Sequence, residues 1–178
     1  MSNAKIQNNT TLTPGTYCGG LDISSGAVVT MEPGIYIFAD DDFKISGGAQ
    51  LAGQEVLLAY TNSKFWMTGG AVMKVTSPRS GLYMNMQFME DAVSQNGNHW
   101  VSIGGDSTLE YDGTMYFPNS NIWIYGGSVV KGKSPNLIMV GDKIWFQDNS
   151  KIELTQVNTR GLPVKETPRL RYGAVMVQ

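Results

Sequence analysis

The stretch Phe43-Lys44-Ile45-Ser46-Gly47-Gly48-Ala49 returns twenty-two residues later as Phe65-Trp66-Met67-Thr68-Gly69-Gly70-Ala71. Each copy contains an apolar residue, any residue and a second apolar residue, followed by a tight turn of small residues. Four more segments have this register: Leu21-Asp22-Ile23, Trp100-Val101-Ser102, Ile122-Trp123-Ile124 and Ile144-Trp145-Phe146. The intervals from Ile23 onward are 22, 22, 35, 22 and 22 residues, so the odd interval is one repeat plus thirteen inserted residues. A fixed period in this range is typical of a solenoid, in which no repeat buries its own apolar face.

Residues one period apart are expected to be neighbours in stacked coils, about 4.8 Å apart. Alternate residues of a strand share one face, so the first and third positions of the six segments both point inward. A second inward column follows the turn: Val29, Leu51, Met73, Thr108, Val130 and Ile152. A third strand follows Pro33-Gly34 or Asp112-Gly113, which completes a three-sided coil. Since parallel crossover connections are right-handed, the sequence predicts an all-β fold: a right-handed, single-stranded parallel β-helix of about six coils.

The repeats organise residues 5–178 as a single β-helix domain, and residues 1–4 are interpreted as the remnant of an expression tag. The 35-residue interval is expected to insert a strand, Leu82–Met89, and a polar loop, Glu90–His99, so that the insertion spans about 78–99. A stack of coils exposes unpaired strand edges at both ends. We expect residues 5–20 and a C-terminal capping tail, about 155–178, to cover them.

The composition excludes several classes of protein. Charged residues make up only 16% of the chain and the net charge is −2, which argues against a nucleic-acid-binding surface. No apolar run approaches the roughly 20 residues of a membrane-spanning helix. The single cysteine, Cys18, cannot form an internal disulfide. It is either a buried small residue or the partner of a cysteine elsewhere in the parent protein.

The motifs that carry catalytic chemistry do not assemble into a site. Gly127–Ser134 matches a phosphate-binding loop formally, but that motif requires a helix at its end, and Pro135 follows here. We find no pair of acids in neighbouring outward positions, and His99, the only histidine, has no second ligand near it. We therefore predict that the chain is not an enzyme and has no cofactor.

The only acidic run is Asp40-Asp41-Asp42. Some polysaccharide lyases of this architecture hold calcium on aspartates that project from one stack of strands. The positions one repeat later, Asn62-Ser63-Lys64, supply a lysine instead of further carboxylates. A water-exposed turn is therefore favoured over a metal site.

An outward column of aromatic residues is the strongest candidate for a binding site. The position between the two inward ones reads Asp22, Lys44, Trp66, Val101, Trp123 and Trp145. Trp66, Trp123 and Trp145 are thus expected to form a stripe on the outside of the solenoid. Contiguous exposed apolar area marks an interaction site. Two interpretations stay open: the insertion or the C-terminal tail covers the stripe, or the tryptophans bind a partner protein or stack on sugar rings.

Several short motifs also resemble a known family. Pro14-Gly15-Thr16-Tyr17-Cys18-Gly19-Gly20-Leu21, Glu32-Pro33-Gly34-Ile35-Tyr36, Ser77–Tyr83 and Asp112–Pro118 are similar to the C-terminal region of TadG-like proteins of tight-adherence (Flp) pilus assembly. The resemblance implies a bacterial envelope protein, exported to the periplasmic or extracellular face and anchored in the membrane by an N-terminal segment outside this sequence. It implies no catalytic residues.

Together these observations favour a non-catalytic structural or adhesion module that binds protein partners of pilus assembly or of the cell surface through an outer face of the solenoid. The alternative is a polysaccharide-binding or polysaccharide-degrading β-helix protein.

Overall fold

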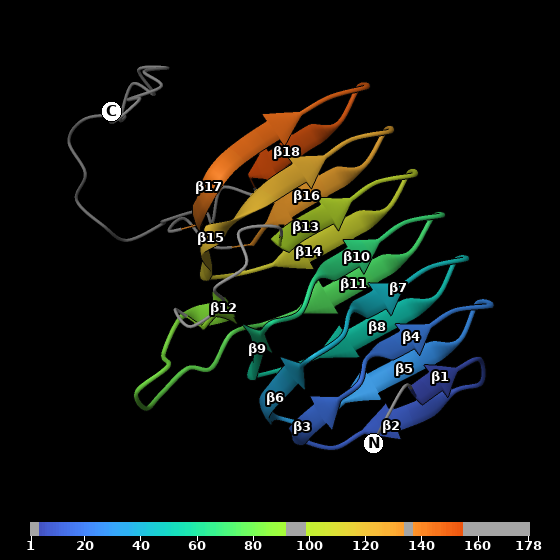
Figure 1. Ribbon diagram of the computed structural model, residues 1–178, viewed down its shortest axis with the longest axis vertical. Helices are drawn as coiled ribbons and strands as arrows, with labels where there is room; N and C mark the ends of the chain where they lie inside the picture. Colours follow the sequence, from blue (N-terminus) through green and yellow to red (C-terminus); the bar gives the residue numbers. More distant parts are fainter. Residues whose placement is uncertain (1–3, 92–98, 134–136, 155–178) are drawn as a thin grey trace, which may run out of the picture.

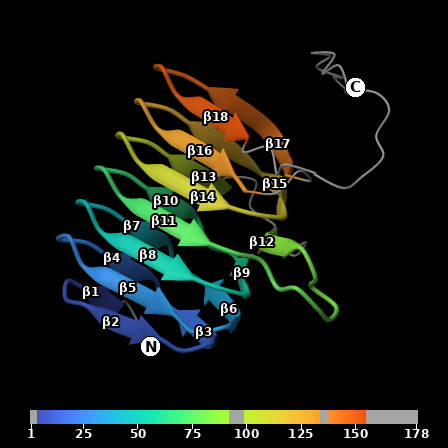
Figure 2. The ribbon, with the colours of Figure 1, turned by 180° about the vertical axis from the view of Figure 1, so that it is seen from behind.

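The computed structural model describes residues 4–91, 99–133 and 137–154, and it confirms the predicted parallel β-helix (Figure 1). The described residues form eighteen strands, and all their pairings are parallel. Within these ranges no helix is present that could cross a membrane. The coils rise from the N-terminal to the C-terminal end in a right-handed sense, and Figure 2 shows the same stack from behind.

Each coil has three sides. Side 1 contains β1 (Ala4–Ile6), β4 (Leu21–Ile23), β7 (Phe43–Ile45), β10 (Phe65–Met67), β13 (His99–Ile103) and the second halves of β15 (Thr114–Ile124) and β17 (Ile138–Phe146). Side 2 contains β2 (Thr10–Leu12), β5 (Val28–Met31), β8 (Gln50–Gly53), β11 (Val72–Val75), β14 (Thr108–Tyr111), β16 (Val129–Gly132) and β18 (Lys151–Leu154). Side 3 contains β3 (Gly15–Cys18), β6 (Gly34–Ala39), β9 (Val56–Thr61), β12 (Met86–Glu90) and the first halves of β15 and β17. We number the six coils 1 to 6 by their side 1 strands, from β4 to β17.

The predicted 22-residue register is confirmed at both ends of the stack. Phe43 pairs with Phe65, and Ile122 pairs with Ile144. The inward residues of side 1 in coils 1 to 3 are almost completely buried, with 0–1% exposure. Residues one period apart are therefore vertical neighbours, as the repeat requires.

The predicted register of coil 4 is wrong by one residue. Phe65 pairs with Val101 and Met67 with Ile103, so the interval there is 36 residues and the following one, from Ile103 to Ile124, is 21. Val101 therefore points inward and is 1% exposed, whereas we expected it on the outside. The same shift places Leu109, not Thr108, in the buried column of side 2.

Aromatic rings form a continuous ladder inside the solenoid. The Phe38 and Phe43 rings are stacked with centroids 4.2 Å apart, and the ladder continues from Phe43 to Phe65 at 5.6 Å and from Phe65 to Phe88 at 5.9 Å. Each buried Phe side chain contributes about 1.5–3 kcal/mol by leaving water. Aromatic pairs at these centroid distances add about 0.5–1.5 kcal/mol each.

The corner between sides 1 and 2 explains the small-residue turn of the repeat. In coil 3, Gly69 and Gly70 have φ of 64° and 72°, values that residues with a Cβ adopt at a cost. A Cβ on Gly69 would also lie 3.1 Å from the Gly47 nitrogen of the coil below. The Gly48 N–H donates to the Gly69 carbonyl at 2.8 Å, so the turns of successive coils are bonded to one another.

The two ends of the described stack differ. Residues 4–18 form a shorter first turn, in which β1, β2 and β3 pair with β4, β5 and β6 and so cover the edge of coil 1. In coil 6, Phe146 and Ile152 occupy inward positions but are 49% and 41% exposed. The capping tail that we predicted, 155–178, lies outside the described residues, as does the tag remnant except for Ala4.

The insertion before coil 4 differs from the prediction in its first half. The expected strand Leu82–Met89 starts only at Met86, and Leu82 is 90% exposed in a turn. The chain reverses there because Gly81 and Asn85 have positive φ, and the Asn85 N–H donates to the Pro78 carbonyl. Glu90, expected to begin the polar loop, ends β12 instead, and residues 92–98 lie outside the described ranges.

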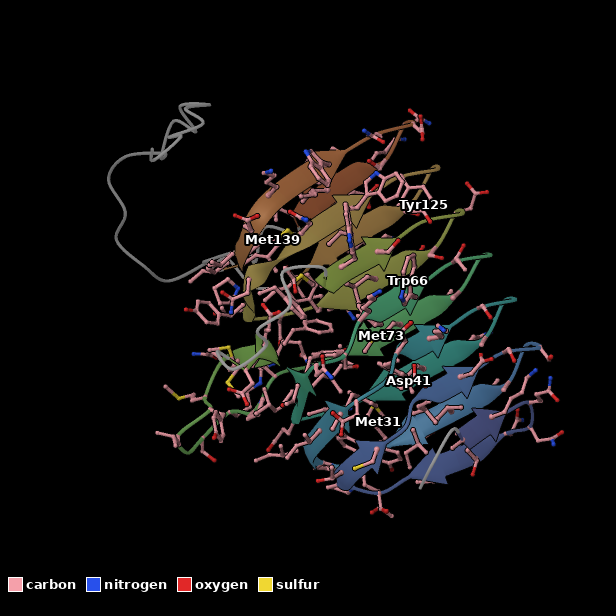
Figure 3. The ribbon with its side chains drawn as sticks, viewed as in Figure 1. Met31, Asp41, Trp66, Met73, Tyr125 and Met139 are labelled. Carbon is pink, nitrogen blue, oxygen red and sulfur yellow. The ribbon has the colours of Figure 1, made fainter. Side chains whose placement is uncertain are left out.

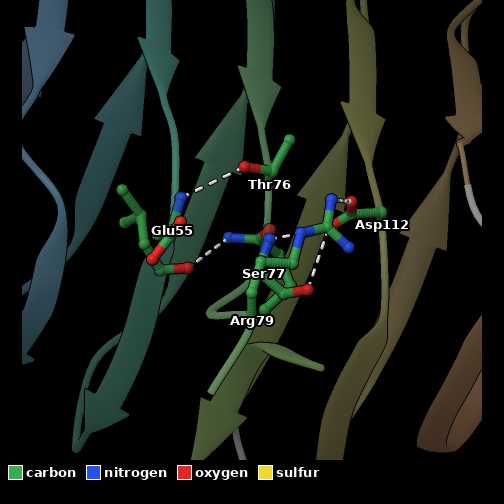
Figure 4. Close-up of polar contacts among 7 residues, drawn as sticks. Glu55, Thr76, Ser77, Arg79 and Asp112 are labelled. Carbon is green, nitrogen blue, oxygen red and sulfur yellow. Dashed lines mark hydrogen bonds and ion pairs between the residues drawn. The ribbon is translucent and has the colours of Figure 1, made fainter. Parts of the chain in front are cut away.

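Two buried carboxylates attach the insertion to coil 4. Asp112 accepts hydrogen bonds from the Ser77 N–H at 2.6 Å and the Ser77 hydroxyl at 2.9 Å, and it pairs with Arg79 (Figure 4). Glu90 accepts from the Ser120 hydroxyl at 2.6 Å and the Asn119 N–H at 3.0 Å. The insertion is thus held by side chains of the next coil.

The outside of side 2 has a ladder of alternating charge. The corrected register aligns Lys74, Glu110, Lys131 and Glu153 on successive coils. Glu110 also accepts a hydrogen bond from Lys133, whose Nζ lies 2.9 Å away. This hydrogen bond and the surrounding lysines lower the pKa of Glu110, although partial burial opposes them.

The stabilising contribution of the ionised Glu110 should be lost at acidic pH. Because its pKa is lower in the folded than in the unfolded protein, its contribution is present above the ordinary value of 4.5 and is lost as the pH falls through the lower folded value. The Glu110→Gln variant should therefore lose less stability than the parent below about pH 4.5. The difference should be under about 1 kcal/mol, because the lysines are largely exposed. Urea unfolding at pH 7 and at acidic pH measures it, and identical pH profiles would contradict it.

Candidate outer aromatic site

The outer face of side 1 carries four aromatic residues in the last three coils. Strand alternation leaves Trp100, Ser102 and Gly104 outward in coil 4. In coil 5 the outward residues are Asn121, Trp123 and Tyr125, and in coil 6 they are Lys143, Trp145 and Gln147. Trp66 extends this face into coil 3, and Figure 3 shows Trp66 and Tyr125 on it. We call Trp100, Trp123, Tyr125 and Trp145 the outer aromatic cluster.

The rings of the outer aromatic cluster pack against one another. Trp123 and Tyr125 are stacked with centroids 4.4 Å apart. Trp100 lies 5.4 Å from Trp145 and 6.1 Å from Trp123, so its ring contacts residues of both following coils. The Trp123 Nε1–H donates to the Gln147 side chain at 3.0 Å. Trp145, 36% exposed, is the most accessible ring, and the other three are half-buried.

Small residues of coil 4 make room for the rings of coil 5. A Cβ on Gly104 would overlap the Tyr125 ring, so glycine is required there by the aromatic side chain. Gly104 has no positive φ, unlike the turn residues Gly105 and Asp106 that follow it. Ser102 lies between Trp66 and Trp123 in the register and is only 1% exposed although it faces outward. The cluster is therefore built into the wall of the solenoid.

Three uncharged polar atoms beside the rings have no hydrogen-bond partner among the residues that the structure describes. They are Trp66 Nε1, Ser102 Oγ and Asn121 Oδ1, and each is shielded from solvent. Ser102 is the direct neighbour of Trp66 on the next coil, and Asn121 is the direct neighbour of Trp100. Buried polar atoms without a partner are uncommon in native proteins, and each requires an explanation.

The structure brings together only part of the predicted stripe. Trp123 and Trp145 pair directly, as expected, and Trp66 faces outward two coils away from Trp123, with Ser102 between them. Val101, which we placed between them, is in the core. Trp100, which we placed inside, faces outward and contacts two tryptophans. The register shift of coil 4 hid Trp100, and Tyr125 was treated only as a turn residue.

The acidic run lies at the corner between sides 3 and 1 and makes local contacts. The Asp42 carboxylate pairs with Lys44 at 3.2 Å, and an Asp41 carboxylate oxygen accepts from the Asp42 N–H at 2.7 Å. Asp40 has φ of 64°, as a turn residue does. Within the described ranges, no group of three or more His, Cys, Asp or Glu residues is arranged to hold a metal ion.

The other sequence candidates have ordinary structural positions. In the formal phosphate-loop match, Val129–Gly132 form strand β16 on side 2, so this part of the motif is not a loop leading into a helix. His99 starts β13 on side 1. Cys18, at the end of β3, is exposed and is a free cysteine in this structure, which excludes the buried interpretation.

Comparison with known proteins adds no identification. No protein-family model matches the chain, and neither the curated proteins nor the solved structures contain a match. The resemblance to TadG-like proteins therefore depends on the short motifs alone.

Proposed function

We propose that this chain is a non-catalytic adhesion or structural module, exported to the bacterial cell envelope, that binds a partner through the outer aromatic cluster. The observation that carries the proposal is the packing of Trp100, Trp123, Tyr125 and Trp145 on one outer face over three coils. Trp and Tyr are the residues most enriched at binding hot spots, because they bury large areas at little entropic cost. The role in tight-adherence pilus assembly, with an N-terminal membrane anchor in the parent protein, follows from the resemblance of the motifs.

The environments of the acidic side chains favour binding over catalysis. Asp112 and Glu90 are buried and hold the insertion in place. Glu110 and Asp42 are paired with lysines. A glycoside hydrolase needs two carboxyl groups that face one cleft and are free to exchange protons. These four acids already have structural partners, which supports a function without chemistry.

The proposal predicts that tryptophans of the cluster can be replaced at a greater cost to binding than to stability. Trp145→Ala and Trp123→Ala should each weaken binding to the major pilin or to another purified pilus-assembly component about tenfold or more, as truncation of a hot-spot residue does. Surface plasmon resonance measures the affinity, and thermal unfolding measures the stability.

Tyr116→Ala provides a matched control. Tyr116 is also an exposed aromatic residue, at 40%, but it projects from side 3. Its replacement should leave the affinity unchanged. If the two tryptophan variants bind as tightly as Tyr116→Ala does, the cluster is not the binding surface. If they unfold at a much lower temperature instead, the rings serve the fold.

A polysaccharide-binding protein is the second candidate. The unpaired Trp66 Nε1, Ser102 Oγ and Asn121 Oδ1 beside the rings favour it, because a saccharide presents both apolar ring faces and hydroxyl groups.

A further inference from the structure

The polar atoms beside the outer aromatic cluster indicate which hydrogen-bonding groups a ligand of this face must supply. Trp66 Nε1 can only donate a hydrogen bond, Asn121 Oδ1 can only accept one, and the Ser102 hydroxyl can do both. All three lie on the outer face of side 1, within adjacent positions of coils 3 to 5. A ligand that satisfies them must offer donors and acceptors close together.

The unpaired atoms also have an energetic consequence. A buried donor or acceptor without a partner costs about 1–3 kcal/mol. Removing such an atom should therefore leave the stability of the free protein unchanged or increase it. Seven shielded side-chain polar atoms have no partner among the described residues, and three of the seven lie in this one area of surface.

No charged group is among the three atoms or the four rings. The nearest cations in the register lie at the two margins of the site: Lys143 pairs with Asn121 from coil 6 and is exposed, and Lys44 pairs with Trp66 from coil 2 and forms an ion pair with Asp42. A phosphate or carboxylate ligand would need a cation at the centre of the site, not at its margin. The site is therefore suited to a neutral ligand.

The rings supply the apolar part of the recognition. The faces of aromatic rings carry partial negative charge and attract groups with partial positive charge, such as the C–H bonds on one face of a sugar ring. Trp145 is the accessible ring, and it contacts Trp100, whose direct neighbour on coil 5 is Asn121. A sugar that displaced Trp145 from Trp100 would meet a ring face next to the position of the Asn121 amide.

We propose that the outer aromatic cluster, together with Trp66, Ser102 and Asn121, is a binding site for a neutral polysaccharide. This inference depends on the proposed function for the location of the site and adds the class of ligand. The sugar stacks on the tryptophan rings, and its hydroxyl groups bond to the three polar atoms. Since these atoms are shielded in the free protein, the rings must move when the ligand binds.

Affinity electrophoresis in gels that contain hydroxyethyl cellulose, dextran or galactomannan tests the proposal directly. At least one of these neutral polysaccharides should retard the protein and should shift its tryptophan emission in solution. Ser102→Ala and Asn121→Ala should each weaken that binding about fivefold or more while the melting temperature is unchanged or higher. Tyr116→Ala should be retarded as the parent protein is.

Other outcomes overturn the proposal. The ligand class is wrong if none of the three polysaccharides retards the protein, or if Ser102→Ala and Asn121→Ala bind as tightly as the parent. Retardation by anionic polygalacturonate alone, lost in Lys143→Ala, would indicate charge recognition instead. Loss of pilin binding in Trp145→Ala without any saccharide binding would refute this inference and leave the proposed function standing.

Discussion

Replacing Asp112 with alanine should lower the free energy of unfolding by about 3–5 kcal/mol, because the two buried donors of Ser77 lose their acceptor, at a cost of about 1–3 kcal/mol each. Asp112 is 4% exposed and accepts hydrogen bonds from the backbone and the hydroxyl of Ser77. It also pairs with Arg79, which belongs to the insertion before coil 4. The variant loses the attachment between the insertion and coil 4. Urea unfolding followed by circular dichroism measures the loss.

Two control variants show how much of the stability loss is due to the buried Asp112 carboxylate itself. Arg79→Ala should cost less, because the guanidinium is 57% exposed and both Ser77 hydrogen bonds remain. Asp142→Ala, at an exposed aspartate of β17, should change stability by no more than about 0.5 kcal/mol. If Asp112→Ala were no more destabilised than Asp142→Ala, Asp112 would not anchor the insertion.

The sequence alone was sufficient to predict the solenoid. In coils 1 to 3, apolar alternation and the small-residue turn specify the same register, since a strand residue such as Phe43 must be apolar and a turn residue such as Gly69 must tolerate positive φ. The pairings of Phe43 with Phe65 and of Ile122 with Ile144 follow from these two signals.

The register of coil 4 could not be predicted because its glycine pair is misleading. Gly104-Gly105 matches Gly69-Gly70 by residue type, and aligning the pairs puts Ser102 in the core. In the structure the two turn residues with positive φ are Gly105 and Asp106. Gly104 is small for a different reason, since the Tyr125 ring of the next coil lies over it. The contact between Gly104 and Tyr125 thus explains a glycine that the residue types alone assign to the turn.

This single shift explains why the sequence did not place Trp100 at the candidate site. With the correct register, Trp100 moves outward, and a stripe of separate tryptophans becomes a packed cluster. The unpaired Ser102 and Asn121 could not be recognised from the sequence, because their burial results from the large side chains around them. Trp123 and Trp145 could be predicted, since their coils follow the regular spacing.

Phe65→Ala should be as destabilising as the loss of Asp112, about 3–5 kcal/mol, because it leaves a cavity in the aromatic ladder. Phe65 is 0% exposed, and its ring lies 5.6 Å from Phe43 and 5.9 Å from Phe88. Phe146→Ala is the matched control: Phe146 also points inward, but it is 49% exposed at the end of the described stack, so its loss should cost about 1 kcal/mol. Urea unfolding of the two variants measures the difference. Equal losses would show that the stacking of one coil on the next is not what buries the core.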